Sequence, residues 1–192
     1  ISQALSEGGR ADLAYRQLLG RQYPSWLYPV TQGATTIWER LNGYTREQGY
    51  GGNNSMNSFN HYSFGAVGQW LVGHSLGIRR AQPGFREFTL APEPDPTGGL
   101  TWARGYYDSP YGRIESGWRR AGNAIEYEFS VPANTHALLR LPRLRAGAHV
   151  SGDDLGPAIA DAGGANGEGE GNGAAAATYR LGSGHYRVTV EE

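Results

Sequence analysis

Residues 83–92 read Pro-Gly-Phe-Arg-Glu-Phe-Thr-Leu-Ala-Pro, and the hydrophobic pattern of the chain changes at this stretch. Before Pro83, apolar residues recur at the spacing of about 3.6 residues that is typical of helices. After it, apolar and polar residues alternate, as they do in half-buried strands. The sequence therefore predicts an α plus β protein in two parts, with helices over residues 1–83 and strands over residues 84–192.

The alternating pattern recurs several times in the second part, at Phe88/Leu90, Leu100/Trp102, 125–131, Leu139/Leu141 and 186–190. Turn-forming Gly, Pro, Asn and Asp residues separate these segments, and this arrangement favours an antiparallel β-sandwich. Residues 163–177 are almost wholly Gly, Ala, Asn and Glu, so we expect a mobile loop there.

The first part contains several helical patterns. We expect the end of a helix closed by Gly8-Gly9, a helix over residues 10–20, a short helix over residues 36–41 and a longer helix over residues 58–76. Residues 23–30 carry two prolines and three aromatic residues. Because Pro29 disfavours a helical conformation at Tyr28, an irregular aromatic loop is expected there.

Composition excludes several classes of function. The 192 residues carry a formal net charge of -1, which predicts no attraction to nucleic acid or to an anionic membrane surface. The absence of cysteine excludes disulfides and thiolate sites. The sequence contains no run of eighteen apolar residues, so no membrane-spanning helix is predicted. No metal is expected because no ligand-spaced set of His and carboxylates occurs. The sequence calls for no cofactor and leaves the compartment open.

A single carboxylate stands out in the first part. Residues 31–40 read Thr-Gln-Gly-Ala-Thr-Thr-Ile-Trp-Glu-Arg, which places Glu39 in the first turn of the short expected helix. One interpretation is a capping box, in which Thr36 and Glu39 cap each other's backbone amides. The other is a functional carboxylate beside Trp38. Spacing alone does not choose between them.

A second polar and aromatic run follows at residues 53–62, Asn-Asn-Ser-Met-Asn-Ser-Phe-Asn-His-Tyr. Its His61 is either a core histidine or a hydrogen-bonding partner for substrate hydroxyl groups. Trp26, in the aromatic loop, either forms the floor of a pocket or packs between helices. Two such clusters close together in the sequence suggest one pocket.

Three segments together closely resemble the carboxyl-terminal end of the catalytic domain in the inverting bacterial α-L-rhamnosidases. They are Tyr23-Pro-Ser-Trp26, Gly33-Ala-Thr-Thr-Ile-Trp-Glu-Arg40 and Met56-Asn-Ser-Phe-Asn-His-Tyr62. Four later segments resemble that family's terminal β-sandwich domain. They are Pro83-Gly84-Phe85, Leu90-Ala-Pro92, Tyr111-Gly112 and Val131-Pro-Ala-Asn-Thr135. The resemblance implies that residues 1–83 are the last helices of an (α/α)₆ barrel and that residues 84–192 are the sandwich.

The resemblance also implies roles for individual residues. Glu39 matches the family's general base, and His61 matches a histidine that contacts the sugar, with Trp26 and Trp38 as further substrate-binding residues. The family's general acid lies in an Asp-Glu-Arg-x-Gly-Trp motif that does not occur in this sequence. The expected partners are therefore a rhamnose-containing glycoside and a preceding, amino-terminal part of the same protein, without which the chain is expected to be inactive.

Two other functions stay open at this point. One is a non-catalytic carbohydrate-binding module whose sandwich presents Trp102, Tyr106, Tyr107 or Trp118 to glycans. Against it, alternation puts Trp102 on the same face as Leu100, which is expected to point inward. The other is a different α/α-barrel glycosidase, or a polysaccharide lyase whose unsaturated product would absorb ultraviolet light.

Overall fold

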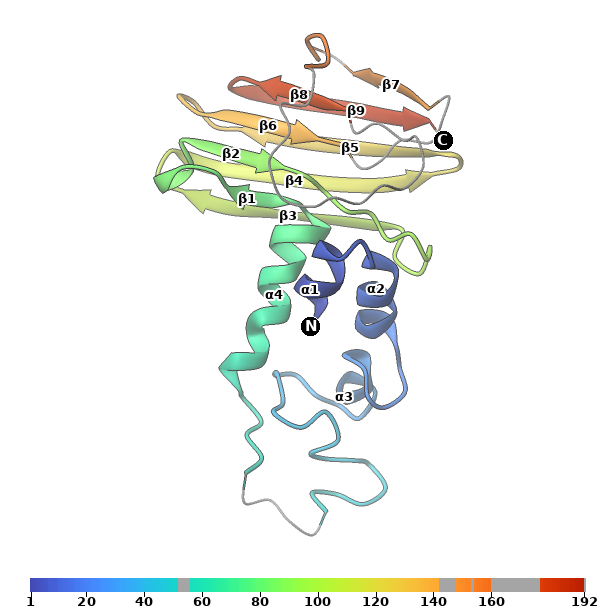
Figure 1. Ribbon diagram of the computed structural model, residues 1–192. Coiled ribbons are helices and arrows are strands. Elements are labelled where there is room, and N and C mark those ends of the chain that lie inside the picture. The colour runs from blue at the N-terminus through green and yellow to red at the C-terminus, as the bar shows by residue number, and fades with distance from the viewer. Residues whose placement is uncertain (52–55, 142–147, 153, 160–176, 192) are drawn as a thin grey trace. The chain divides into compact units, whose positions relative to one another are not determined.

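The computed structural model describes residues 1–51, 56–141, 148–152, 154–159 and 177–191 (Figure 1). The chain divides into two compact units. The first comprises residues 1–71 with 95–100, and the second comprises residues 72–94 with 101–192. Helices come first and two β-sheets follow, as the sequence predicts. The domain boundary between residues 83 and 84 stays a prediction, and the expected loop over residues 163–177 lies, except for Ala177, outside the described residues.

Two buried aromatic rings join three of the helices of the first unit. The helices of this unit are α1 (Ser2–Glu7), α2 (Ala11–Leu19), α3 (Leu27–Thr31) and α4 (Ala66–Trp70). Tyr15 and Trp70 are almost fully buried and meet edge to face with ring centroids 5.1 Å apart. The Trp70 indole N–H also donates to Ser6 Oγ at 2.9 Å. These contacts join α1, α2 and α4, and α2 confirms the helix expected over residues 10–20.

One helix prediction in this unit was wrong at its start. The helix expected from Ser58 begins at Tyr62, with η1 (Tyr62–Gly65) leading into α4 and then into η2 (Leu71–Ser75), a π-helical turn. Residue His61, just before it, is extended, with φ -97° and ψ 102°, and its N–H donates to Ile37 O at 2.8 Å. This long-range bond removes His61 from the helix.

The segment expected to be an irregular loop contains α3. Pro29 is the third residue of this helix, where the N–H that proline lacks would have no intrahelical partner. Proline is therefore compatible with the first turn, and the prediction of a fully irregular segment was wrong.

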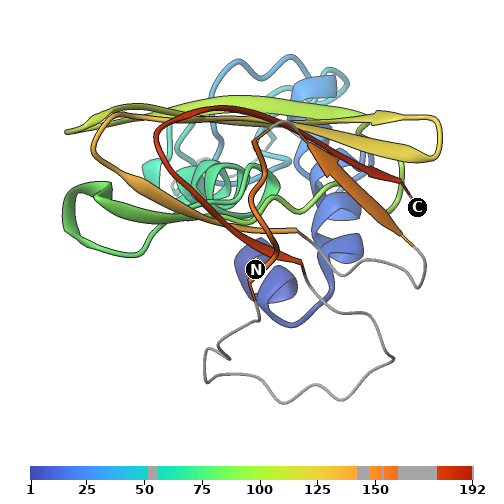
Figure 2. The same ribbon diagram turned by 90° about the horizontal axis from the view of Figure 1, so that it is seen from above.

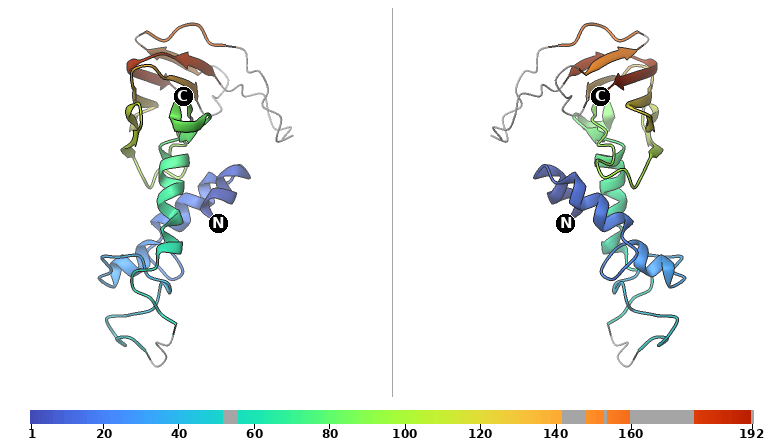
Figure 3. Two further views of the ribbon diagram at one scale, coloured as in Figure 1. Left: turned by 90° about the vertical axis from the view of Figure 1, so that its left-hand side faces the viewer. Right: turned by 90° about the vertical axis from the view of Figure 1, so that its right-hand side faces the viewer.

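The second unit consists of two stacked sheets (Figures 2 and 3). The four-stranded sheet has the order β1 (Ile78–Arg80), β2 (Glu87–Leu90), β6 (His136–Arg140), β8 (Thr178–Leu181). The five-stranded sheet has the order β3 (Trp102–Ser109), β4 (Gly112–Ala121), β5 (Ala124–Val131), β9 (Gly184–Glu191), β7 (His149–Gly152). All pairs in the five-stranded sheet are antiparallel, whereas β2 and β6 run parallel in the other.

The core lies between the two sheets and follows the alternation of the sequence. Its largest buried side chains are Phe88, Leu90, Ile114, Trp118, Tyr127, Phe129, Leu139, Leu181 and Val188. Each such side chain stabilises the fold by about 1.5–3 kcal/mol relative to an exposed position. Two buried hydrogen bonds attach β4 to the residues before β1. Trp118 Nε1 donates to Ser75 O at 2.9 Å, and Ser116 Oγ donates to Leu76 O at 2.6 Å.

Trp102 points away from this core, so the prediction that it faces inward was wrong. Its side chain is 60% exposed. The strand begins at Trp102, and Leu100 lies outside it, because the Leu100 N–H donates to Asp95 Oδ2 at 2.8 Å. The alternation therefore does not extend from Leu100 to Trp102. Trp118, by contrast, is 3% exposed and belongs to the core.

Candidate active site

Two extended segments of the first unit meet at Glu39. The Glu39 N–H donates to Ser58 O at 2.8 Å, and the His61 N–H donates to Ile37 O at 2.8 Å. These bonds resemble a short antiparallel ladder, although neither segment is a regular strand. They bring together the two polar and aromatic runs of the sequence, apart from residues 53–55, which lie outside the described residues.

The short helix and the capping box expected at residues 36–41 are absent. The Thr36 hydroxyl donates to Phe59 O, and the Glu39 carboxylate accepts the Ser58 N–H at 2.9 Å. Both groups of the expected box are thus used by the second segment. The backbone at residues 36–40 consequently stays non-helical, and the local capping interpretation of Glu39 is wrong.

The Glu39 carboxylate is held in place but remains open to solvent. Its side chain is 25% exposed, and Oε2 lies 3.8 Å from Nδ1 of His61, whose side chain is 28% exposed. That separation exceeds hydrogen-bond distance. A polar group of a ligand can therefore reach both side chains, one a proton acceptor and the other able to donate or accept a hydrogen bond.

A row of aromatic rings extends from His61. Its imidazole centroid is 5.3 Å from the ring of Phe64, and the ring of Phe64 is 6.5 Å from that of Trp26. Phe64 is 42% exposed, and Trp26 is half-buried. The row forms an apolar wall next to the polar pair of Glu39 and His61, an arrangement suited to a ligand with both hydroxyl groups and apolar C–H faces.

Trp38 lies beneath the segments that carry Glu39. It is 7% exposed and meets Phe59 and Tyr44 edge to face, at centroid distances of 5.1 and 6.3 Å. Tyr50 completes this cluster through contacts with Tyr44 and Phe59. The observed contacts of Trp38 are those of a support for the site, and its substrate-binding role stays a prediction.

A side-chain amide joins the two segments beyond Glu39 and Ser58. Asn57 Nδ2 donates to Gly43 O at 3.2 Å, and a Cβ atom on Gly43 would lie only 2.5 Å from Asn57 Oδ1. Any side chain at position 43 would push the amide away. Gly43 therefore leaves the room that the Asn57 amide occupies.

Sequence reasoning missed two residues of this site. Ser58 contributes its backbone N–H, and no side-chain pattern reports which amide a carboxylate will accept. Phe64 links Trp26 to His61, and its position three residues after His61 was an available signal because helical spacing puts such residues on one side.

Neither a metal site nor a membrane helix was found in the ranges that the structure describes. No group of three His, Asp or Glu side chains there could hold a metal ion. No helix within the same ranges is long and apolar enough to cross a membrane.

Comparison with known proteins assigns both parts of the chain to one family. Residues 1–74 match the bacterial alpha-L-rhamnosidase 6 hairpin glycosidase domain, and residues 77–155 match the bacterial alpha-L-rhamnosidase C-terminal domain. The chain belongs to the bacterial α-L-rhamnosidases. It is a carboxyl-terminal portion of such a protein, containing the end of the hairpin domain followed by the C-terminal domain.

The α-L-rhamnosidases that this chain matches are much longer than the chain. An alpha-L-rhamnosidase of Formosa agariphila is 40% identical over 142 residues, which are 74% of this chain and 15% of that protein. One of Streptomyces avermitilis is 37% identical over 138 residues, or 72% of this chain and 13% of that protein. The chain thus spans about a seventh of the relatives it matches.

Solved α-L-rhamnosidase structures share the fold of the chain. The crystal structure of the Streptomyces avermitilis enzyme complexed with L-rhamnose has a TM-score of 0.80 at 32% identity, covering 99% of this chain and 17% of that one. The Dictyoglumus thermophilum enzyme has a TM-score of 0.76 at 28% identity, covering 100% of this chain and 20% of that one. The resemblance inferred from the motifs is confirmed.

Proposed function

We propose that this chain belongs to an inverting α-L-rhamnosidase in which Glu39 is the general base. The observation that carries the proposal is a carboxylate anchored through one oxygen to the Ser58 N–H, beside His61, with a quarter of its side chain exposed. Among the described residues, the other oxygen, Oε1, accepts no hydrogen bond from the protein. That oxygen is available to a water molecule.

The reaction that follows is a single displacement. Glu39 accepts a proton from water while the water oxygen attacks the anomeric carbon of rhamnose from the face opposite the leaving group. The bond from that carbon to the leaving oxygen breaks, and a general acid protonates this oxygen. The products are rhamnose of inverted configuration and the free alcohol, and Glu39 then returns its proton to solvent.

The general acid is proposed to lie in a part of the protein that precedes this chain. Inversion requires the two carboxyl groups to be roughly 6.5–9.5 Å apart so that water fits between them. His61 and Trp26 are proposed to bind the sugar, His61 through a hydroxyl group and Trp26, with Phe64, along an apolar face. Trp38 is proposed to contribute to substrate binding by supporting the segments that carry Glu39 and His61.

The surface of the first unit supports a preceding part as its partner. Six large apolar side chains there are more than half exposed: Tyr62 at 91%, Ile1 at 88%, Met56 at 72%, Tyr50 at 60%, and Tyr23 and Val30 at 56% each. Apolar side chains gathered on one unit usually mark an interface. We propose that preceding barrel helices cover them and complete the sugar pocket.

Hydrolysis of 4-nitrophenyl α-L-rhamnoside tests the proposal. The measurement compares the protein extended to its native start, its Glu39→Gln variant and the 192-residue chain. Release of 4-nitrophenol by the extended wild type alone is the expected result. Equal release by the Glu39→Gln variant would exclude Glu39 as the base. The control is Glu47→Gln, which changes an exposed carboxylate in the same unit.

A further inference from the structure

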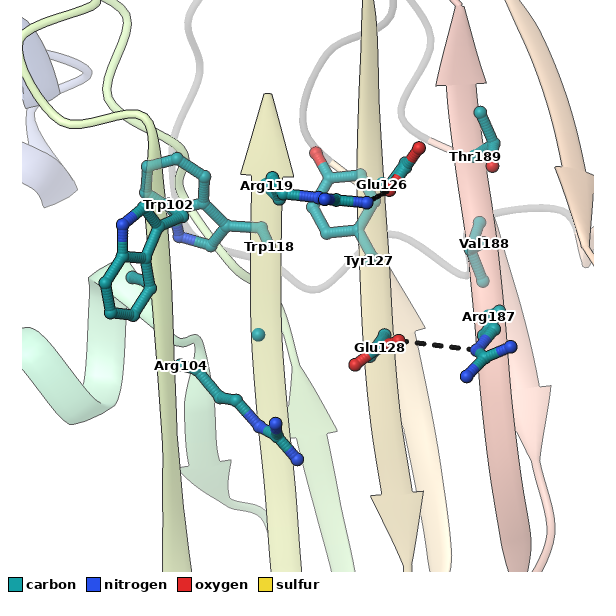
Figure 4. Close-up of a pocket in the computed structure, with 12 residues that line it drawn as sticks. Trp102, Arg104, Trp118, Arg119, Glu126, Tyr127, Glu128, Arg187, Val188 and Thr189 are labelled. Carbon is teal, nitrogen blue, oxygen red and sulfur yellow. Dashed lines mark hydrogen bonds and ion pairs between the residues drawn. The ribbon is translucent and has the colours of Figure 1, made fainter. Parts of the chain in front are cut away.

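The outer face of the five-stranded sheet carries an open hollow of about 680 Å³ (Figure 4). It lies entirely within the second unit and has Gly117 of β4 as its floor. Gly117 is paired with Arg104 of β3 and Glu128 of β5. Because glycine has no side chain, a gap remains between the neighbouring side chains on this face.

Trp102 stands at the rim of the hollow with an unused aromatic ring. Among the residues that the structure describes, no other ring or cation covers it. Tyr106, four residues further along the strand on the same face, is different, because the guanidinium of Arg113 lies 3.7 Å from its ring centroid. Trp102 is therefore the aromatic platform of this face, and Tyr106 is occupied.

The charges around the hollow leave one cation uncompensated. Arg119 pairs with Glu126, and Arg187 pairs with Glu128 at 3.3 Å. The stem of Arg104 lies over Gly117, with Cγ 3.4 Å from the position of a Cβ atom there. Within the described ranges its guanidinium has neither a hydrogen bond nor an ion pair.

A second hollow of about 320 Å³ continues the first along the strands. Both share Arg104, Gly117, Glu128 and Arg187 in their linings. The second reaches a polar cluster in which Ser130 Oγ lies 2.8 Å from Glu115 Oε2 and 2.8 Å from His185 Nδ1. The serine lies between the other two groups, so this cluster lacks the order of a hydrolytic triad, in which histidine is central.

We propose that this groove binds an acidic oligosaccharide. One sugar ring stacks on Trp102, and the carboxylate of a uronic acid residue pairs with Arg104. The free cation favours an anionic ligand over a neutral one. The lining combines aromatic rings with three arginine and two glutamate side chains, and this mixture fits a glycan better than it fits the charge-depleted centre of a protein interface. The groove uses no residue of the first unit, which carries Glu39, so this proposal does not rest on the proposed function.

Titration of the 192-residue chain with oligogalacturonate, followed by tryptophan fluorescence, tests this proposal. The ligand control is the same oligosaccharide with its carboxyl groups methyl-esterified. We expect the free acid to bind, and added salt should weaken this binding because it screens the charges. The ester should bind roughly tenfold more weakly than the acid, the loss expected when a hydrogen bond to a charged group is removed. Glu39→Gln should leave this binding unchanged, which separates the groove from the catalytic proposal.

Variants locate the site, with calorimetry as the readout where Trp102 is replaced. Trp102→Ala and Arg104→Gln should each weaken binding by roughly tenfold, as loss of an aromatic anchor or a charged partner does. Tyr106→Ala and Arg113→Gln, matched changes on the same face, should not. The proposal is overturned if the wild type does not bind or if acid and ester bind equally. It is also overturned if the control variants weaken binding as much as Trp102→Ala and Arg104→Gln do, or if the upstream-extended protein does not bind the oligosaccharide.

Discussion

Glu39 and Ser58, nineteen residues apart in the sequence, are joined by two hydrogen bonds. One runs from the Ser58 N–H to the Glu39 carboxylate at 2.9 Å, and the other runs from the Glu39 N–H to Ser58 O at 2.8 Å. The backbone of the second segment thus holds both the chain and the carboxylate of the proposed base. Ser58 therefore contributes to the site through its backbone N–H and C=O groups, not through its side chain.

This relationship predicts opposite results for two substitutions of Ser58 in the extended protein. Ser58→Ala keeps the N–H and should leave kcat nearly unchanged. Ser58→Pro removes the N–H, so kcat should fall by about tenfold or more, the loss expected for one hydrogen bond to a charged group. Steady-state kinetics on 4-nitrophenyl α-L-rhamnoside provides the measurement, with thermal melting to verify folding. Equal activity of two folded variants would argue against a role for this amide.

His61 is predicted to act on sugar binding. Its imidazole lies beside Glu39 and against Phe64, so His61→Ala should lower kcat/KM by roughly tenfold through loss of one hydrogen bond to the substrate. His61→Asn, which keeps a donor and an acceptor, should recover part of that loss. His136→Ala, a change of an exposed histidine in β6, is the control. Unchanged kcat/KM in His61→Ala would remove His61 from the site.

Gly77 is predicted to be essential for the second unit. Its φ is +71°, and a Cβ atom there would lie 2.0 Å from the carbonyl carbon of Ala91. Gly77→Ala should destabilise the protein by about 4 kcal/mol or more, since strain and a backbone clash combine. Gly73→Ala is the matched control because nothing lies within 4 Å of its Cβ position. Urea unfolding of both variants gives the comparison, and a similar midpoint would contradict the clash.

Two tryptophans of the same sheet should respond differently to replacement by phenylalanine. Trp118→Phe leaves the buried Ser75 carbonyl without its indole donor and should cost about 1–3 kcal/mol of unfolding free energy. Trp102→Phe changes a 60% exposed residue and should cost within about 0.5 kcal/mol. Chemical denaturation measures both. Equal losses would mean that the Trp118 hydrogen bond contributes nothing measurable.

The sequence predicted the β-part well where alternation was long. Residues 125–131 and 186–190 fall in β5 and β9 because side chains that alternate between core and solvent leave a clear period of two. Among the short strands, β2 was predicted from Phe88 and Leu90, whereas β1, β7 and β8 were missed, since three or four residues rarely carry a clear period of two. Trp102 was misplaced because its strand begins only at that residue.

The site was predicted in part. Motif resemblance identified Glu39 and His61, which the structure brings within 3.8 Å of each other. The local structure of Glu39 was mispredicted because the capping pattern considers only neighbours in sequence. In the folded chain, Phe59 and Ser58 take up the Thr36 hydroxyl and the Glu39 carboxylate. Such long-range competition cannot be read from one short segment.

Azide rescue of Glu39→Ala in the upstream-extended protein tests whether Glu39 is the general base. Removing the base should lower kcat by about 10²–10⁴-fold. Azide needs no base to attack the anomeric carbon, so it should restore 4-nitrophenol release and yield rhamnosyl azide of inverted, β configuration, detectable by nuclear magnetic resonance. Wild-type activity in Glu39→Ala, or an azide product of retained configuration, would contradict the assignment of Glu39 as the general base of an inverting reaction.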